Sequence, residues 1–238
     1  EECYVVLKKD LSKEFLDFLK RKDYKGNVDG NKYTVYGVSS HGAWPQGGKN
    51  AISMMAEFLR GRTDHPLFRF IDEKLAFDHF GKKLGIDCYD EEMKELTINP
   101  AILRLEDGKF MIGSNIRYPR NYDFESGLAR ITANANNYGL DCTALGNSPS
   151  HYVSPDDPFV LTLYHAYQKY SRDFETPMMT IGGGTYARML KKAVAFGPSF
   201  PGESEVAHQP DEFLTIENLL KAAAIYAEAI EKLAGTEE

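Results

Sequence analysis

The strongest constraint on the fold of this 238-residue chain is a hairpin signal in its first half. Two strand-like runs, Ile102–Leu105 and Phe110–Ile116, flank a four-residue segment that contains the dipeptide Asp107-Gly108. Asp-Gly readily adopts the positive φ angles that a two-residue turn needs. The sequence therefore predicts two antiparallel strands joined by a tight turn.

Short strands and amphipathic helices alternate around this hairpin over residues 1–150. Apolar side chains recur at helical spacing in three segments, and the last of these helices is expected to end at Gly139, because glycine favours the C′ position. We expect strands at 4–7, 33–38 and 140–145, helices at 11–19, 50–60 and 124–135, and a mostly helical link at 66–85. This pattern predicts an α/β (α+β) fold with two sheet-plus-helix halves.

A composition break at Asn147–Ser150 places a domain boundary after residue 150. In residues 151–238, Asp156 or Asp157 is expected to cap a helix with Pro158 in its first turn, and Thr215 to cap the final helix. Short strands are expected at 178–181 and 193–196. The sequence thus predicts two domains, 1–150 and 151–238.

Composition excludes several classes of function. The chain has 42% hydrophobic and 26% charged residues, which is typical of a folded domain, and its net charge of −7 argues against binding to nucleic acid or to an anionic membrane. It contains no apolar run of about 18 residues, the length of a spanning helix. Its three cysteines form neither a disulfide framework nor a Cys-x-x-Cys motif, so we expect a cytoplasmic protein, with a truncated secreted protein as the alternative.

Three consecutive glycines, Gly182–Gly184, stand between an apolar run and a predicted helical turn. Glycine lets backbone amides approach an anion closely because it has no Cβ, although such a run can also be a simple turn. The spacing matches neither a dinucleotide-binding motif nor a P-loop, and the chain has no Gly-x-Ser-x-Gly elbow. Nucleotide binding and serine hydrolysis are therefore not supported.

The order of these features resembles a known family. The segments that carry the resemblance are Ser40–Ala51, Phe80–Ile86, Asn115–Pro119, His151–Val153 and Ile181–Arg188 with the following His208-Gln209-Pro210. Together they are similar to the di-zinc metallopeptidases that include carboxypeptidase G, and most similar to the dipeptidase V branch. The resemblance implies a lid domain over residues 1–150 and the C-terminal part of a catalytic domain over residues 151–238.

The same resemblance implies roles for individual residues. His41 would reach from the lid to the oxyanion of the tetrahedral intermediate, Arg117 would hold the substrate carboxylate, and His208 would bind one zinc ion. Each has a structural alternative: a turn-capping histidine, a surface ion pair and a solvated loop histidine. Asn50 is expected to cap the helix that follows it. Amides of the glycine loop would bind the same carboxylate as Arg117, and this loop comprises Gly182, Gly183, Gly184 and Thr185.

Most of the family's zinc ligands are missing from these residues. No histidine is followed two positions later by aspartate, and Glu-Glu occurs only at the two termini and at Glu91-Glu92. We therefore expect a C-terminal portion of an enzyme that binds two zinc ions when it is complete. The 238 residues alone should bind zinc weakly and should be inactive, and their partner would be the missing N-terminal catalytic segment.

The sequence thus favours a zinc-dependent dipeptidase acting on dipeptides with a free C-terminal carboxylate. A monomer is expected, because the second half of a dipeptidase V-like lid takes the place of a partner subunit's lid. Two alternatives stay open: a non-catalytic binding or regulatory module, and a relative that acts on N-acyl amino acids or succinyl-diaminopimelate.

Overall fold

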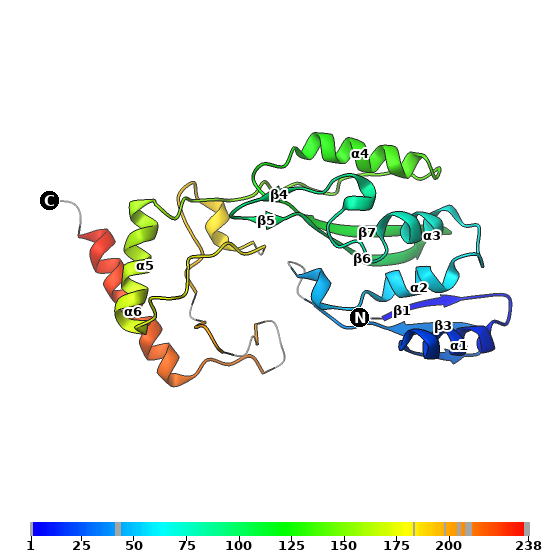
Figure 1. Ribbon diagram of the computed structural model, residues 1–238, viewed down its shortest axis with the longest axis horizontal. Helices are drawn as coiled ribbons and strands as arrows, with labels where there is room; N and C mark the ends of the chain where they lie inside the picture. The colour runs from blue at the N-terminus through cyan, green and yellow to red at the C-terminus, as the bar shows by residue number, and fades with distance from the viewer. Residues whose placement is uncertain are drawn as a thin grey trace. The chain divides into compact units, whose positions relative to one another are not determined.

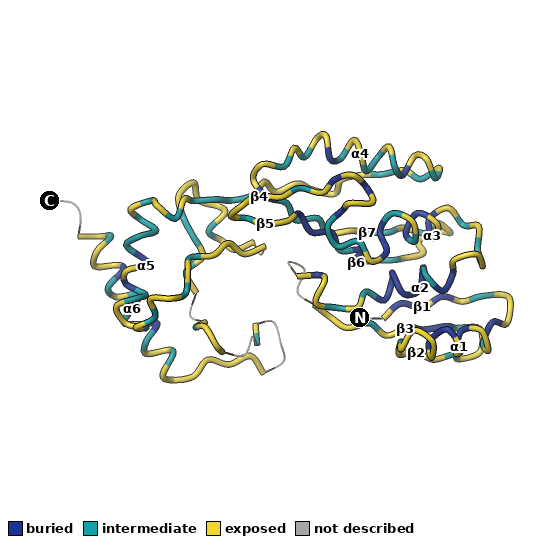
Figure 2. Tube along the Cα trace, in the orientation of Figure 1, coloured by how far each residue is buried: buried dark blue, intermediate teal, exposed yellow. Residues whose placement is uncertain are grey.

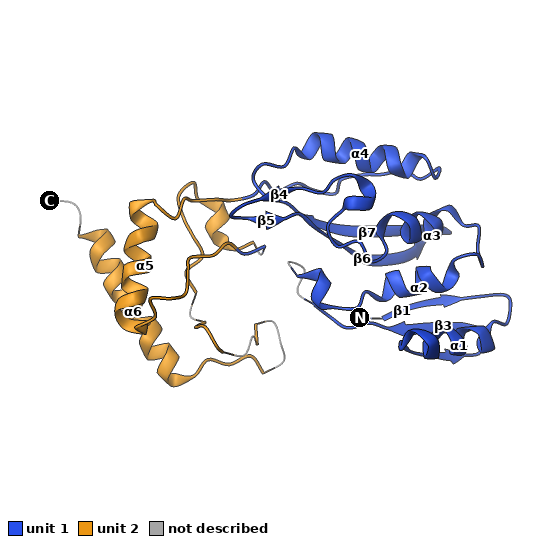
Figure 3. Ribbon diagram, in the orientation of Figure 1, with its two compact units in different colours: residues 1–150, 181–183 blue, residues 151–180, 184–238 orange. Residues whose placement is uncertain are grey.

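The computed structural model describes residues 2–40, 44–182, 184–197, 199–203, 206–207 and 211–235. The chain divides into two units (Figure 3). Unit 1 comprises residues 1–150 and 181–183, and unit 2 comprises residues 151–180 and 184–238. The first unit therefore includes a short segment from the second half of the sequence.

Unit 1 begins with a three-stranded antiparallel sheet and two helices (Figure 1). The sheet has the order β1-β3-β2. Its strands and helices are β1 (Glu2–Val6), α1 (Ser12–Lys22), β2 (Lys25–Asp29), β3 (Lys32–Tyr36) and α2 (Ala51–Leu59). β2 was not predicted from the sequence, whereas the other four elements were. Alternate residues of β1 are buried, as expected for a strand with one face on a core.

Aromatic side chains form the centre of the core of unit 1. Phe15 of α1, Tyr33 of β3 and Phe58 of α2 are fully buried. The ring of Phe15 lies edge-on to both others, with centroids 5.4 Å from Tyr33 and 4.8 Å from Phe58. Edge-to-face pairs add about 0.5–1.5 kcal/mol beyond the burial of their area. These contacts fix both helices against the sheet.

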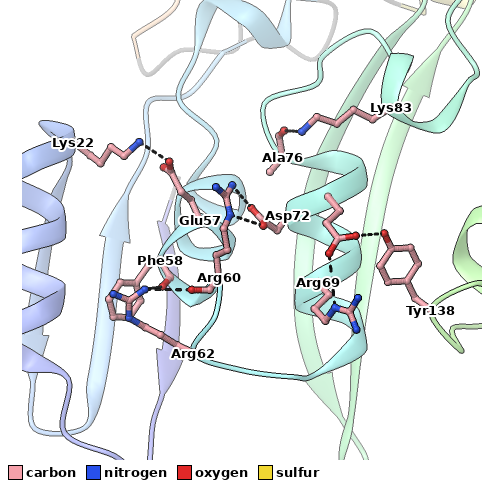
Figure 4. A network of polar contacts seen from close by, with 11 residues as sticks. Lys22, Glu57, Phe58, Arg60, Arg62, Arg69, Asp72, Ala76, Lys83 and Tyr138 are labelled. Atoms are coloured by element: carbon pink, nitrogen blue, oxygen red, sulfur yellow. Dashed lines mark hydrogen bonds and ion pairs between the residues drawn. The ribbon is translucent and has the colours of Figure 1, made fainter.

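Polar contacts join the C-terminal end of α2 to neighbouring elements (Figure 4). The guanidinium of Arg60 donates to both carboxylate oxygens of Asp72, at 2.7 and 2.8 Å. Glu57 pairs with Lys22 at 2.6 Å and accepts a hydrogen bond from the Tyr24 hydroxyl at 3.2 Å. Burial, together with the Glu57 carboxylate, raises the pKa of Tyr24 to about 12. The elements that follow are α3 (Pro66–Phe70), a π-helical turn η2 (Ile71–Leu75), η3 (Lys82–Leu84), β4 (Tyr89–Asp90) and β5 (Lys94–Glu95).

The hairpin is confirmed. β6 (Thr97–Glu106) and β7 (Lys109–Arg117) are antiparallel and closed by Asp107 and Gly108, whose φ angles are 49° and 75°. α4 (Phe124–Asn136) follows, capped by Asp123, and Gly139 adopts a positive φ just after its end. The strand predicted at 140–145 is wrong: residues 140–150 have no regular structure, because no described strand pairs with them.

Unit 2 contains two long helices, α5 (Pro158–Ser171) and α6 (Ile216–Ala234), capped by Asp157 and Thr215 as predicted. They pack through Leu163 and Ala166 on α5 and Ile225 and Ala229 on α6. The strands predicted at 178–181 and 193–196 are absent from the described residues, since neither segment has a strand partner there. Most of α5 and α6 is exposed or half-buried (Figure 2).

The fold is a mixed α/β structure with small antiparallel sheets, as predicted. Besides η3, the described residues contain two other short 3₁₀ turns, η1 (Pro45–Gly47) and η4 (Tyr186–Met189). Within the described ranges, no helix has both the length and the apolar character needed to cross a bilayer.

Candidate substrate-carboxylate site

Arg117 is the last residue of β7 and lies opposite Thr97 of β6. The strand ends there because Tyr118 is followed by the buried Pro119, which cannot donate to a ladder. Its side chain is half-buried. A strand end presents its side chain from a rigid element, and such positions hold a binding group more precisely than a loop does.

Two contacts orient the Arg117 guanidinium within unit 1. Nε donates to the Asn115 side-chain oxygen at 3.1 Å, and Nη1 donates to the backbone carbonyl of Gly182. Asn115 and Arg117 are two residues apart on one strand and therefore share a face. Among the described residues, no carboxylate forms an ion pair with Arg117. The guanidinium has five N–H donors, so it retains donors for a ligand.

The structure brings Arg117 together with Gly182, the first residue of the glycine loop. Gly182 belongs to unit 1 and offers its carbonyl, an acceptor, rather than its amide. Gly183 lies outside the described residues. Gly184 and Thr185 belong to unit 2, where the Thr185 hydroxyl caps η4 by accepting from the Ala187 amide at 3.2 Å. Anion binding by the loop amides stays a prediction.

Three other arginines, Arg104, Arg120 and Arg188, are also candidates for binding a carboxylate, and the first two pair with acidic side chains. Arg120 pairs with Asp90 at 3.1 Å and with Glu92 at 2.6 Å. Hydrogen bonds from the Met93 and Glu92 amides, with the Arg120 guanidinium, lower the pKa of Asp90 below its usual range. The exposed Arg104 lies 3.4 Å from Glu106, also on β6. In unit 2, the Arg188 guanidinium lies beside Gly184, 2.7 Å from where a Cβ would stand.

Tyr118 has a role that sequence reasoning missed. Its hydroxyl donates to the side-chain oxygen of Asn147, its carbonyl accepts from the Ser150 hydroxyl, and its ring lies 4.9 Å from that of Tyr122. The segment 147–150, whose composition break predicts the domain boundary, thus contacts the residue that follows β7. No local sequence signal reveals this contact, because the partners are 29 and 32 residues apart.

The candidate catalytic and metal-ligating histidines, His41 and His208, lie outside the described residues. Asn50, from the same motif as His41, caps α2 as predicted: its side-chain oxygen accepts from the Ser53 amide at 3.0 Å. Across the described ranges, no three His, Cys, Asp or Glu side chains are grouped closely enough to hold a metal ion. Zinc binding by His208 stays a prediction.

Two further contacts hold the start of unit 2. Nε2 of His151 lies 2.6 Å from the carbonyl oxygen of Ala193. Asp157, the cap of α5, pairs with Lys192 at 2.9 Å. The segment that the sequence marked as a motif, residues 151–153, therefore begins with a histidine that contacts backbone.

Comparison with known proteins agrees with the motifs. Residues 29–232 match the model of peptidase family M20/M25/M40. "Putative dipeptidase YtjP" of Bacillus subtilis (strain 168) is 40% identical over 235 residues, which cover 94% of this chain and 50% of that protein. "Putative dipeptidase SSP1012" of Staphylococcus saprophyticus is 35% identical, with the same coverage. The chain spans about half the length of the relatives it matches. It belongs to peptidase family M20/M25/M40.

Proposed function

We propose that the full-length protein is a dipeptidase that hydrolyses dipeptides with a free C-terminal carboxylate. The family match and the names of the relatives support a peptidase. The observation that carries the substrate assignment is Arg117, held at the end of β7 by Asn115 and Gly182 without a carboxylate partner in the described chain.

A guanidinium and a carboxylate form two parallel, charge-assisted hydrogen bonds when their geometry allows it. The substrate carboxylate would compete with the Gly182 carbonyl for Nη1 of Arg117. A carboxylate held at a fixed distance from the scissile bond selects short substrates. Dipeptides are therefore favoured over longer peptides.

The proposal includes zinc, with His208 as one ligand and His41 as the oxyanion donor. Zinc sites in hydrolases use three protein ligands and an open position, so the remaining ligands would come from polypeptide outside these residues. The 238-residue chain by itself should then bind zinc weakly and hydrolyse no dipeptide. Robust hydrolysis by this chain alone would contradict the fragment interpretation.

The carboxylate assignment is tested with a matched substrate pair, a dipeptide and its C-terminal amide. The full-length enzyme should prefer the free acid. Arg117→Ala should lower kcat/KM for the acid by about 10- to 100-fold, the loss expected for hydrogen bonds to a charged group, and should leave the amide nearly unchanged. Arg104→Ala, on the partner strand, is the control. An Arg117→Ala enzyme that still prefers the acid would remove Arg117 from substrate binding.

The histidine roles are separated by metal analysis. His208→Ala should lower both bound zinc and turnover. His41→Ala should keep the zinc content and lower kcat by about 10² to 10³, the usual loss for one oxyanion donor. Unchanged zinc in the first variant, or unchanged kcat in the second, refutes the respective assignment.

A further inference from the structure

Two strands of unit 1 each have one unpaired edge. β1 is an outer strand of the order β1-β3-β2, and β6 pairs only with β7. Throughout the described residues, no hydrogen bond of the backbone ladder joins β1 to β6. Unpaired edges are templates for another strand, and proteins usually cover or interrupt them.

A groove of about 1040 Å³ lies along both edges. It is lined by all of β1 and by residues 99–106 of β6. α2 packs against both strands and contributes Ile52 and Leu59 to the lining, next to Phe68 of α3. The groove therefore combines two backbone edges with apolar side chains.

The two strands run in the same direction. Asn50, at the N-terminus of α2, donates to the Asn99 side chain at 3.0 Å and to the Pro100 carbonyl at 2.7 Å, near the start of β6. The start of β1 lies at the same end, because Glu2 pairs with Tyr36 and Val38 pairs with Lys49, just before Asn50. Figure 1 shows β1 and β6 running the same way along α2.

The register identifies the unpaired backbone groups of β1. The Leu7 amide donates to the Asn31 carbonyl, so Leu7 faces the partner strand β3. Residues of an antiparallel strand alternate between facing the partner and facing away. The N–H and C=O groups of Tyr4 and Val6 therefore point away from β3, at the edge that lines the groove.

The same argument applies to β6. A two-residue turn closes on a hydrogen-bonded pair, here Glu106 and Lys109. By alternation, the backbone groups of Leu103 and Leu105 point away from β7. Both residues line the groove. The two edges thus present donors and acceptors along one channel.

We propose that an extended segment of the full-length polypeptide, from outside these 238 residues, inserts as a β-strand between β1 and β6. This inference rests on the proposal that the full-length protein is longer than this chain. The strand runs antiparallel to both neighbours and joins the two sheets of unit 1 into one. Its backbone pairs with Tyr4 and Val6 on one side and with Leu103 and Leu105 on the other.

The relatives argue for an occupant from the same polypeptide, because they are about twice as long as this chain. A tethered strand also needs little intrinsic affinity, since its effective concentration reaches the millimolar range. One inserted strand requires edges about 10 Å apart, which is two strand spacings. Side chains that face Ile52 and Leu59 of α2 must be apolar, so the strand carries apolar residues at alternate positions.

Hydrogen exchange tests the strand directly. Amides of Tyr4, Val6, Leu103 and Leu105 should exchange on the order of 100-fold more slowly in the full-length protein than in the 238-residue chain. The amides of Val5 and Arg104, which face strands already present, are internal controls and should change much less. Equal exchange at the four edge amides in both proteins would overturn the proposal.

Proline substitution gives a second test. Tyr4→Pro removes an outward-facing amide without touching the β1–β3 ladder. It should lower the melting temperature of the full-length protein by about 3 °C or more while changing that of the 238-residue chain little. Val28→Pro, on the opposite edge of the same sheet, should affect both proteins equally. Equal effects of Tyr4→Pro on the two proteins would contradict an inserted strand.

One other occupant, a second copy of this chain, has a distinct outcome. If the edge amides are already protected in the 238-residue chain, and this chain is a dimer that Tyr4→Pro makes monomeric, the occupant is a second copy and the proposal is wrong. Dipeptide hydrolysis is measured on the same full-length samples. Activity without edge protection refutes the strand alone, whereas protection without activity refutes the proposed function alone.

Discussion

Unit 1 and unit 2 differ in how completely they bury their own apolar residues. In unit 1, α1, α2 and the sheet enclose fully buried aromatic rings, and predicted strands such as β6 and β7 found partners. In the described part of unit 2, the buried apolar side chains are five on α5 and α6: Leu163, Ala166, Ala222, Ile225 and Ala229. Unit 1 therefore has a large hydrophobic core, whereas the core of unit 2 in the described residues is small.

One face of α6 carries exposed apolar side chains. Ile216, Leu219, Leu220 and Ile230 are 55–77% exposed, and their spacing places them on one side of the helix, opposite Ile225. A helix that is apolar on two faces is typical of an element buried on both sides. In the described part of the chain, α6 therefore packs one apolar face within unit 2 and leaves the opposite apolar face exposed.

The largest effect is expected in the core of unit 1. Phe58→Ala should lower the free energy of unfolding of this unit by about 3–5 kcal/mol, because it leaves a cavity among Phe15, Phe18 and Tyr33. Urea denaturation followed by circular dichroism measures it, and hydrogen exchange assigns it to unit 1. Phe174→Ala, at an exposed position of unit 2, should change nothing. A loss as small as the control's would show that unit 1 is no better packed than unit 2.

The next effect tests whether the two units unfold separately. Ile225→Ala should cost about 2 kcal/mol, the low end for this truncation, because few side chains surround Ile225. Faster exchange should be confined to α5 and α6. Ile216→Ala, the same change on the exposed face of α6, is the matched control. Faster exchange in α2 as well would show that the units unfold together.

A smaller effect depends on pH. The ion pair with Lys192 and the Phe159 amide hold the pKa of the Asp157 carboxyl below its ordinary value. The unfolded chain then takes up the proton first as pH falls, so Asp157 stabilises α5 above about pH 5 and loses this contribution as pH falls through its folded pKa. Asp157→Asn keeps a capping side chain and should flatten the fall in melting temperature between pH 5 and 3. Asp156→Asn is the control and should leave the pH dependence of the melting temperature as in the wild-type protein. A flattened dependence in this variant would contradict the assignment to Asp157.

The smallest effect is expected on the exposed face of α6. Leu220→Gln should change the stability of the 238-residue chain by no more than about 0.5 kcal/mol, as for other exposed positions. In the full-length protein the same change should cost about 1.5–3 kcal/mol if the face is covered. Thermal unfolding of both proteins gives the comparison. Equal, small effects would show that α6 faces solvent in both.

Local signals predicted the elements that need no distant partner. Asp107-Gly108 predicted the hairpin, and capping side chains predicted the starts of α2, α5 and α6. The predicted strands at 140–145, 178–181 and 193–196 have apolar runs but no described neighbour, and a strand without a neighbour cannot form a ladder. β2 was missed because Val28 is its single apolar residue apart from glycine.

For the candidate site, the motif Asn115–Pro119 indicated Arg117. The contacts around the Arg117 side chain were only partly predictable from the sequence. The contact with Asn115 follows from strand periodicity, since residues i and i+2 share a face. The contact with Gly182 joins residues 65 positions apart, and no local pattern encodes it. His41 and His208 stay predictions from the resemblance.

The membership of residues 181–183 in unit 1 has a consequence for how this protein can be divided. The backbone passes between the units three times, after residues 150, 180 and 183. A gene truncated at the 150/151 boundary would encode Arg117 without Gly182, its carbonyl partner. Recombination at that junction would not exchange the two units as intact blocks, because residues 181–183 of unit 1 lie beyond it. We therefore expect the two units to be inherited together.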